Sequence, residues 1–414
     1  MKKLLFFLML FFITDLIISQ HKELPKWEKG FLDIHFISTG KGSAAFYILP
    51  DGTSMLIDVG DLSSIDDERR PPAMPDNSKS APQWVADYIY QFHPDGKKAV
   101  LDYALITHYH DDHMGSPNNN SKTHIEGNYK LFGITELGSI IPIKKLIDRG
   151  YDYPVDFRNP KSEMNMGEMK GLRQFKEYWR FIEYQQEKNK LQYEKFRVGS
   201  INQFKLKAEQ INNTKFTIKN LFANGDIANI YDTTVATRKF KDGEYPGENN
   251  LSCGIRITYG RFDLYTGGDI NGIGHTGNAD FFSMEAYAAP VIGQVDVATL
   301  NHHGNRDSQN EYFVRTIQPR VWIGQSWTAR HPGEEVVRRI TSTFVYPGER
   351  DLFTNFLLPA TKTYFGKLVD DSYKSTSGHI VIRVYPDGNN YDLFILDDKT
   401  EKRHIIATYN YKSR

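Results

Sequence analysis

Cysteine is almost absent from this sequence: Cys253 is the only one among 414 residues. A single thiol cannot form an internal disulfide, so the fold must depend on its hydrophobic core, with or without bound metal. With 40% hydrophobic and 13% aromatic residues, the chain is long enough to bury one large core or two ordinary ones. We therefore expect a globular protein.

An excess of charge of either sign is also missing. The chain has 51 Lys and Arg residues against 51 Asp and Glu residues, whereas proteins that bind a nucleic acid backbone usually carry excess positive charge. Without the first twenty residues, which contain Lys2, Lys3 and Asp15, 49 basic residues face 50 acidic ones. No strong basic surface is expected, so nucleic acid would have to bind in a local cleft.

Long apolar runs are missing beyond the N-terminus. There, Lys2 and Lys3 precede the run LLFFLMLFFI from Leu4 to Ile13, which is shorter than the roughly 20 residues of a membrane span. This pattern predicts a signal peptide over residues 1–20, with an uncleaved N-terminal anchor as the alternative. We expect an exported protein, in the periplasm or outside a bacterial cell, with no membrane span after cleavage.

Internal repeats, low-complexity tracts, P-loops and Rossmann glycine patterns are absent as well. Instead, β-branched and aromatic runs between Phe31 and Gly60 predict three short strands, the last ending at Asp58. A helix over 84–92 and a buried strand over 99–107 follow. This alternation predicts a layered α/β fold with polar groups at strand ends.

Six consecutive residues, His108 to His113, contain three histidines and two aspartates. Side chains repeat every two residues at the end of a strand, so His108 and His110 should point the same way. The chain then turns, which brings Asp112 and His113 toward the same cavity. Imidazole with carboxylate suits Zn²⁺, Mn²⁺ or iron, and this density can supply two neighbouring ions. The alternative, a solvated histidine-rich loop, is improbable with only 13 histidines in the chain.

Later strands also end in polar groups. The run FDLYTGGD ends at Asp269, whose carboxylate can bridge two cations, and VATLNHHG ends in His302 and His303. Adjacent residues cannot easily bind one metal from an extended segment, so one of the two histidines should be a ligand and the other a donor or supporting group. His331 in RHPG lies between a predicted strand and a helix, where it can overhang a cleft or simply cap the surface.

The HxHxDH pattern of residues 108–113 resembles the metallo-β-lactamase fold hydrolases. The segments TGKGSAAFYILPDGTSMLIDVG, YGRFDLYTGGD, DVATLNHHGNRDS and SGHIVIRVYPDG resemble the extracytoplasmic hydrolase domain of the competence protein ComEC and its relatives, the ComEC/Rec2 type. The resemblance runs from about residue 31 to 395. It implies a four-layer αββα fold over residues 28–414, with a helical insertion at about 140–216, an irregular extension at about 341–372 and closing strands at about 376–396.

The same resemblance implies two divalent metal ions, zinc first, with manganese or iron as alternatives. The implied ligands are His108, His110, Asp112, His113, Asp269 and His303. Asp58 would orient a ligand histidine, and His302 or His331 would assist the leaving group or contact the substrate phosphate. Many members have a further histidine where this chain has ENNLS, so Asn249 or Asn250 would line the site instead, and the two metal positions need not be equally tight.

The implied reaction is attack by a metal-bound hydroxide, in which Asp112 takes part, on a phosphodiester in a small or short substrate. Carboxylic ester or lactone hydrolysis on the same ions is the alternative. A non-catalytic metal-stabilised binding module is disfavoured because structural zinc sites are closed by four ligands. No protein partner is predicted.

One helical pattern within the predicted insertion has two interpretations. Leu172, Phe175, Tyr178, Trp179 and Ile182 recur every three to four residues. This stripe would either pack on the core as a lid or stack on a base or sugar of the substrate.

Overall fold

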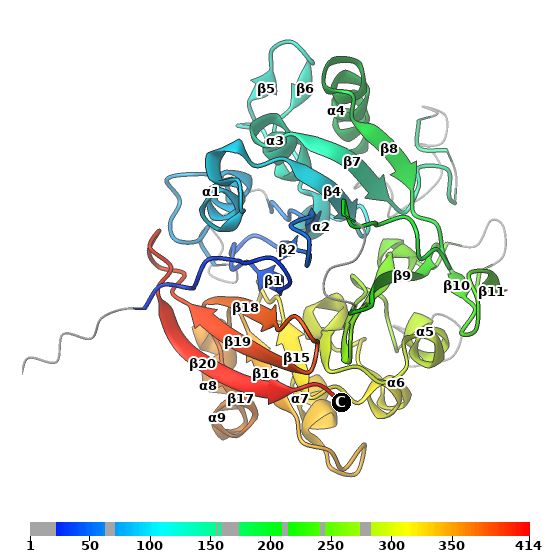
Figure 1. Cartoon of the computed structure of the whole chain (residues 1–414), viewed down its shortest axis with the longest axis vertical. Helices are drawn as coiled ribbons and strands as arrows, with labels where there is room; N and C mark the ends of the chain where they lie inside the picture. The colour runs from blue at the N-terminus through cyan, green and yellow to red at the C-terminus, as the bar shows by residue number, and fades with distance from the viewer. Residues whose placement is uncertain are drawn as a thin grey trace, which may run out of the picture.

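The computed structural model describes residues 22–62, 71–154, 156–158, 174–208, 214–240, 245–273 and 283–414. The predicted signal peptide and Leu172 lie outside these ranges. Within them, two large mixed sheets pack face to face and helices cover their outer surfaces (Figure 1).

The first sheet has nine strands among the described residues, in the order β20-β19-β18-β1-β2-β3-β4-β7-β8. Its strands are β1 (Leu32–Phe36), β2 (Ala45–Ile48), β3 (Ser54–Ile57), β4 (Leu101–Ile106), β7 (Ile143–Asp148), β8 (Gln192–Lys195), β18 (His379–Val384), β19 (Asn390–Leu396) and β20 (Ile405–Lys412). The pairs from β3 to β8 are parallel and the others antiparallel. The three strands predicted between Phe31 and Gly60 are confirmed as β1 to β3.

The second sheet also has nine described strands, in the order β11-β10-β9-β12-β13-β14-β15-β16-β17. Its strands are β9 (Phe216–Ala223), β10 (Asp226–Ala228), β11 (Val235–Arg238), β12 (Gly254–Tyr259), β13 (Phe262–Thr266), β14 (Val297–Thr299), β15 (Val321–Gly324), β16 (Asp351–Thr354) and β17 (Tyr373–Ser375). From β13 to β17 all pairs are parallel. The carboxyl ends of these strands therefore meet at one edge, where sites on such sheets usually form.

The helices lie on the two outer faces or between strands. They are α1 (Ala81–Phe92), α2 (Asp111–Met114), α3 (Gly133–Ile140), α4 (Gln174–Asn189), α5 (Met284–Ile292), α6 (Glu311–Ile317), α7 (Glu334–Thr341), α8 (Pro359–Phe365) and α9 (Lys367–Ser372). Three 3₁₀ turns, η1 (Gly96–Lys98), η4 (Glu248–Leu251) and η5 (Asn301–Gly304), and a small hairpin of β5 (Thr123–His124) and β6 (Tyr129–Lys130) complete the described elements.

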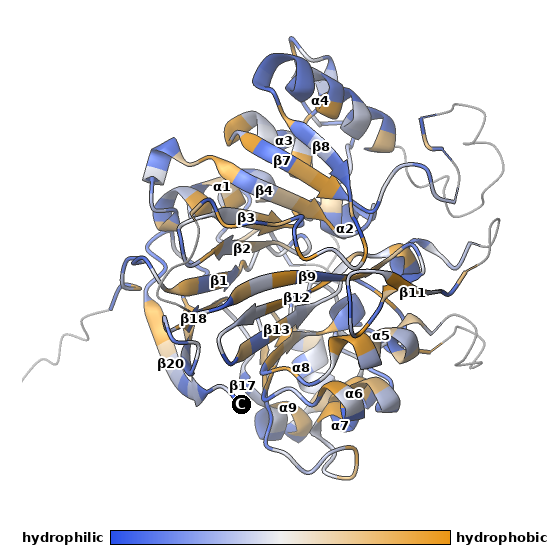
Figure 2. Cartoon of the chain, turned by 45° about the vertical axis from the view of Figure 1, so that its right-hand side comes forward, coloured by the Kyte–Doolittle hydropathy of each residue, from blue (hydrophilic) through white to orange (hydrophobic). Residues whose placement is uncertain are grey.

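Three hydrophobic clusters separate four layers. The central one joins the two sheets, with fully buried residues such as Ile34 from β1 and Ile255 from β12. A second lies between the first sheet and α1, α3 and α4, and a third between the second sheet and α5, α6 and α7. Figure 2 shows hydrophobic residues along the strands and on the helices that cover them. This αββα layering confirms the metallo-β-lactamase fold predicted from the sequence.

Two strands from the predicted insertion at about 140–216 lie in the first sheet. β7 pairs with β4 and β8 with β7, so both strands extend the first sheet. In α4, the rings of Phe175 and Tyr178 and the side chain of Ile182 are buried against this sheet. Of the two interpretations of the aromatic stripe, packing on the core fits these contacts. Likewise, the 341–372 segment holds β16 within the second sheet and α8 and α9 beside it.

Among the described residues, no helix combines the length and apolar character needed to span a membrane.

Candidate metal centre

Glycines hold the histidine-rich loop close to the first sheet. A Cβ atom on Gly42 or Gly60 would lie 2.3 or 2.1 Å from the carbonyl oxygen of Asp112, closer than any real contact, and Gly42 also has a φ of +130°. The amide of Ser43 donates to the same carbonyl at 2.8 Å. The TGKGS turn thus fixes α2, and with it Asp112 and His113, at the ends of β3 and β4.

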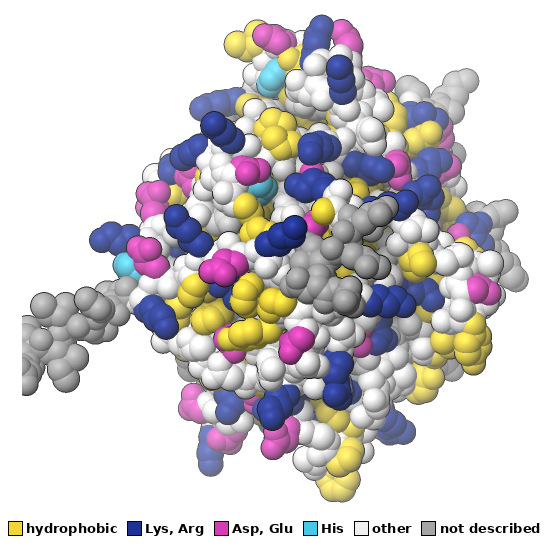
Figure 3. Space-filling model, viewed as in Figure 1, with side chains coloured by type: hydrophobic (Ala, Val, Ile, Leu, Met, Phe, Trp, Pro, Cys, Tyr) yellow, Lys and Arg dark blue, Asp and Glu magenta, His cyan; other side chains and the backbone are white. Residues whose placement is uncertain are grey.

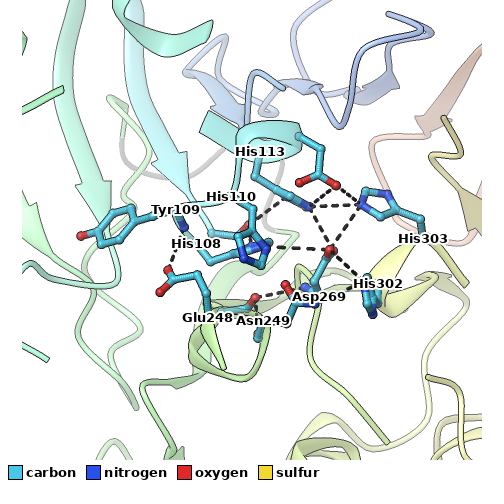
Figure 4. A network of polar contacts seen from close by, with 12 residues as sticks. His108, Tyr109, His110, His113, Glu248, Asn249, Asp269, His302 and His303 are labelled. Carbon is cyan, nitrogen blue, oxygen red and sulfur yellow. Dashed lines mark hydrogen bonds and ion pairs between the residues drawn. The ribbon is translucent and has the colours of Figure 1, made fainter. Parts of the chain in front are cut away.

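Four buried side chains from three strand ends form a first donor group: Asp112, His113, Asp269 and His303. Figure 4 shows His113, Asp269 and His303 of this group pointing toward one another. Nε2 of His113 lies 3.1 Å from an oxygen of Asp269 and 3.2 Å from Nε2 of His303. Nε2 of His303 lies 3.0 Å from Asp112 and 3.3 Å from Asp269. One donor atom from each residue lies within 4.8 Å of all the others.

The hydrogen bonds of Nδ1 in His113 and His303 indicate that, in the neutral rings, Nδ1 carries the proton and Nε2 has the free lone pair. Nδ1 of His303 lies 2.7 Å from the carbonyl oxygen of Gln325, which can only accept, so Nδ1 carries the proton. Nδ1 of His113 lies 2.8 Å from the Asp58 carboxylate, which favours a proton there too. In the neutral rings, both Nε2 lone pairs therefore face the carboxylate oxygens. Only a cation or added protons can make this convergence of acceptors favourable, and this donor set fits a divalent metal ion.

A second donor group consists of His108, His110 and Asp112. Nε2 of His108 lies 3.1 Å from Nδ1 of His110, as expected for side chains that leave one strand end on the same face. Asp112 belongs to both groups, and Asp269 lies 4.0 Å from His108. The sequence thus predicted all six residues that the structure brings together, in groups of four and three.

Charge within the site acts against the effect of burial. Burial would raise the pKa values of Asp112 and Asp269, but His113 and His303 lower both below the usual range. Burial would lower the pKa of His303, yet Asp269 and Asp112 raise it to about 9. His108 behaves differently, because burial and then the charge of His113 lower its pKa well below 6.5. A neutral His108 is ready to bind metal, while metal at the first group must displace protons.

Asp58 lies behind His113, at the end of β3. Its carboxylate accepts the backbone N–H of Thr107 at 2.7 Å and the Thr107 hydroxyl at 2.8 Å, as well as His113 Nδ1. Asp58 adopts a φ of +60°, which is unusual for a residue other than glycine. The structure places Asp58 where it can orient a ligand histidine.

His302 lies beside the first donor group and is not part of it. Its Nδ1 lies 2.7 Å from Asp307, and its Nε2 lies 3.2 Å from the Asn249 amide and 4.0 Å from Asp269. Asp307 and Asp269 raise the pKa of His302 against the opposing effect of burial. His303 is thus in position to be the ligand, and His302 lies beside the site.

His331 stacks on His303, with ring centroids 4.6 Å apart and an angle of 17° between the planes. It is buried, and its Nδ1 has no hydrogen-bond partner among the described residues. Burial and the charge of His303 lower its pKa well below 6.5. Trp327, which the sequence did not single out, packs edge-on against both rings, and its indole N–H points at His303 Nε2 from 3.3 Å.

The two asparagines of η4 have different surroundings. Asn249 reaches His302, and its side-chain oxygen is buried with no partner among the described residues. Asn250 accepts the backbone N–H of Asn271 at 2.9 Å and donates to the carbonyl of Pro246. Asn250 therefore holds the turn, and Asn249 is the one of the pair that faces the site.

Sequence reasoning missed the support of the histidine loop by Glu248. This buried carboxylate accepts the backbone N–H of Tyr109 at 2.9 Å and pairs with Arg149 through two hydrogen bonds of 2.7 and 2.8 Å. The Arg149 guanidinium lies over the Tyr109 ring, 4.3 Å from its centroid. No local pattern marks these residues, because they come from the residue after β7, from η4 and from the loop after β4.

No protein-family model and no curated protein sequence matches this chain. Some solved structures resemble it distantly. A candidate metal-dependent hydrolase from Parabacteroides distasonis is 14% identical, with a TM-score of 0.32 over 78% of this chain and 92% of that one. The short form of human tRNase Z is 14% identical, with a TM-score of 0.29 over 65% and 77%. A protein of unknown function from Enterococcus faecalis is 10% identical, with a TM-score of 0.29 over 84% and 76%. At these values the similarity indicates no substrate, and the metallo-β-lactamase fold rests on the four layers described above.

Proposed function

We propose that this protein is an exported, metal-dependent phosphodiesterase of the ComEC type that acts on small or short substrates. One observation carries the proposal: the Nε2 atoms of His113 and His303 and the carboxylates of Asp112 and Asp269 converge on one point in a buried site. Elsewhere in proteins, such open imidazole and carboxylate sets hold hydrolytic metal ions.

The residues present fit two divalent ions. Asp112, His113, Asp269 and His303 would hold one, and His108 and His110 would hold the other with an oxygen of Asp112. Imidazole with carboxylate favours zinc, with manganese or iron as alternatives. Bound ions of this kind lower the pKa of a coordinated water and neutralise charge that develops on a phosphoryl oxygen.

The chain's own residues would then orient the ligands and supply a proton. Asp58 keeps the His113 ring turned with Nε2 toward the centre. Asp307 accepts from Nδ1 of His302 and favours a second proton on Nε2. That proton would go to the leaving oxygen as the P–O bond breaks. The neutral His331 and the amide of Asn249 would contact the phosphate and fix its position.

A small or short substrate fits the surface charge. Figure 3 shows Lys and Arg side chains interspersed with Asp and Glu across the face in view, with no continuous basic stripe. The balanced composition agrees with this distribution. Long nucleic acids are held mainly through many phosphate contacts, which such a surface does not offer.

Export is proposed from the N-terminal sequence alone, Lys2 and Lys3 followed by the apolar run from Leu4 to Ile13. Expression of the full chain in a bacterium, followed by fractionation and mass determination, tests it. A mature protein without the first twenty or so residues, found outside the cytoplasm, is the expected result, and an uncleaved chain in the membrane fraction would contradict it.

Hydrolysis of bis-p-nitrophenyl phosphate by the metal-loaded protein tests the activity. We expect turnover that His113→Ala abolishes and that His124→Ala leaves unchanged, because His124 lies in the β5–β6 hairpin against Tyr129. Lactone turnover without any phosphodiester cleavage would overturn the substrate class. A fully metallated protein with no hydrolytic activity would overturn catalysis itself.

A further inference from the structure

The loop that carries His302 and His303 is conformationally strained. His302, His303 and Gln309 have φ values of +47°, +53° and +49°, a region that residues other than glycine seldom adopt. Several such residues in one short loop persist only when surrounding contacts hold them. The loop also contains Asp307, which contacts His302.

Glu285, on α5, supplies those contacts from beneath the loop. It is fully buried, and one carboxylate oxygen accepts the Asn301 side-chain amide at 2.8 Å and the backbone N–H of Gln309 at 2.6 Å. The other oxygen accepts the backbone N–H of Asn310 at 2.7 Å. One carboxylate therefore ties both ends of the 301–310 loop together.

Further hydrogen bonds strengthen this arrangement. The Tyr265 hydroxyl donates to the Asn301 side chain at 2.8 Å, and the Gln309 side chain donates to the Asn301 carbonyl at 3.2 Å. Asn301 directly precedes the two histidines. The position of the loop backbone thus depends on a network centred on Glu285.

Glu285 is costly to bury as an anion. Its hydrogen-bond donors among the described residues are neutral groups, and Arg339 donates to the carbonyls of Ser308 and Gln309. Burial raises the pKa of Glu285 to about 7 in spite of these hydrogen bonds. A buried carboxylate without a paired cation is rare in a core that needs only packing, which indicates a specific task.

We propose that Glu285 is the positioning residue of the metal centre: it holds the strained 301–310 loop so that His303 faces the metal and His302 lies beside it. This inference rests on the proposed function, because it assigns Glu285 a part in metal binding. Groups that orient metal ligands from behind typically change metal affinity by 10–100-fold when they are replaced.

The first test replaces the acceptor and keeps its shape. In Glu285→Gln, an amide NH₂ group takes the place of one carboxylate oxygen. It then faces an N–H group of the 301–310 loop, and two donors cannot form a hydrogen bond with each other. We expect zinc to bind at least 10-fold more weakly in competition with a chromophoric chelator. Glu311→Gln on α6, where the exposed carboxylate pairs with Arg315, is the matched control and should bind like wild type.

The second test displaces the carboxylate and keeps its charge. A Cβ atom on Gly272 would lie 1.9 Å from an oxygen of Glu285, so Gly272→Ala should weaken zinc binding in the same direction. Gly348→Ala, whose nearest contact would be an ordinary 3.4 Å, is its control. This variant decides the matter if Glu285→Gln fails to fold.

Amide hydrogen exchange of residues 301–310 in metal-free protein supplies a readout independent of metal. We expect faster exchange in both variants, confined to this loop. If both variants bind zinc as tightly as wild type does and their 301–310 amides exchange at the wild-type rate, the proposed role of Glu285 is wrong. If wild-type protein binds no zinc, the proposed function fails, and unchanged loop exchange in the variants would then overturn the positioning role separately.

Discussion

At the scale of single residues, the site is defined by which nitrogen of each histidine carries a proton. Gln325 and Asp58, neither of them a ligand in the proposal, turn the Nε2 atoms of His303 and His113 toward the two shared carboxylates. The sequence pattern predicted which imidazole and carboxylate side chains come together, and it singled out Asp58 beside His113. It did not predict the Gln325 carbonyl, because a backbone group leaves no residue signature.

Replacing Asp58 with asparagine should weaken metal binding by about 10–100-fold. The amide can present a donor to Nδ1 of His113 and so favours the wrong tautomer, with Nε2 protonated. Competition with a chelator measures the loss. Asp387→Asn, at an exposed turn, is the control, and equal affinity in the two variants would contradict the assigned role.

Asp307→Asn should separate substrates by their leaving groups. His302 would lose the carboxylate that favours its second proton, so esters with alkoxide leaving groups should be cleaved about 10²-fold more slowly. The p-nitrophenolate ion needs no proton to leave, and its release should change little. The ratio of kcat for the two substrate types is the measurement. An equal fall for both would assign Asp307 a purely structural role.

At the scale of elements, the sequence predicted the strands near the site well, because each is a short apolar run that ends in a marked turn or polar cluster. β3, β4, β13 and β14 all end where the polar residues begin. The 140–216 region was harder to predict. Its strands β7 and β8 reveal their place only through pairing with β4, which is a long-range contact.

The ion pair between Arg149 and Glu248 connects β7 to η4 beneath the histidine loop. Arg149→Met would leave the Glu248 carboxylate charged and buried, which typically costs about 3–5 kcal/mol of unfolding free energy. Urea unfolding measures this loss. Arg158→Met breaks an exposed pair with Asp156 and should cost about 1 kcal/mol or less. A loss as small at Arg149 would contradict the importance of the buried pair.

At the scale of the whole molecule, the alternation of strands and helices predicted the layered fold, and the family resemblance indicated which polar residues would lie together. The supporting residues Glu248, Glu285 and Trp327 were not predictable, since each comes from a different element and touches the site only after folding. Sequence patterns reveal ligands at strand ends, whereas the groups behind them are fixed by tertiary packing.

The pH dependence of the free energy of unfolding should show the cost of ionising Glu285 in the core. Its pKa is raised from 4.5 to about 7 by burial, so the folded state holds a proton that the unfolded state has lost. Metal-free protein should therefore lose about 3 kcal/mol of unfolding free energy from this group as the pH rises from about 4.5 to 7. This pKa already includes the charge of Arg339, which lowers it against the effect of burial.

The variant Glu285→Gln cannot titrate at this position. Urea titration at pH 5 and pH 8 measures the free energy of unfolding of wild type and variant. Between these two pH values, wild type should lose about 3 kcal/mol more than the variant does. A difference independent of pH would mean that Glu285 stays ionised in the fold throughout this range.

Asp112 is common to both donor groups, so the two ions of the proposed centre would not bind independently. Whichever ion arrives first neutralises part of the negative charge that would attract the second. With four donors against three, the first group should fill before the second wherever the pH is high enough for its histidines to lose their protons, and loading should then proceed in order. Scarcity of metal would then lower the fraction of molecules that hold both ions more steeply than it lowers the total amount of metal bound.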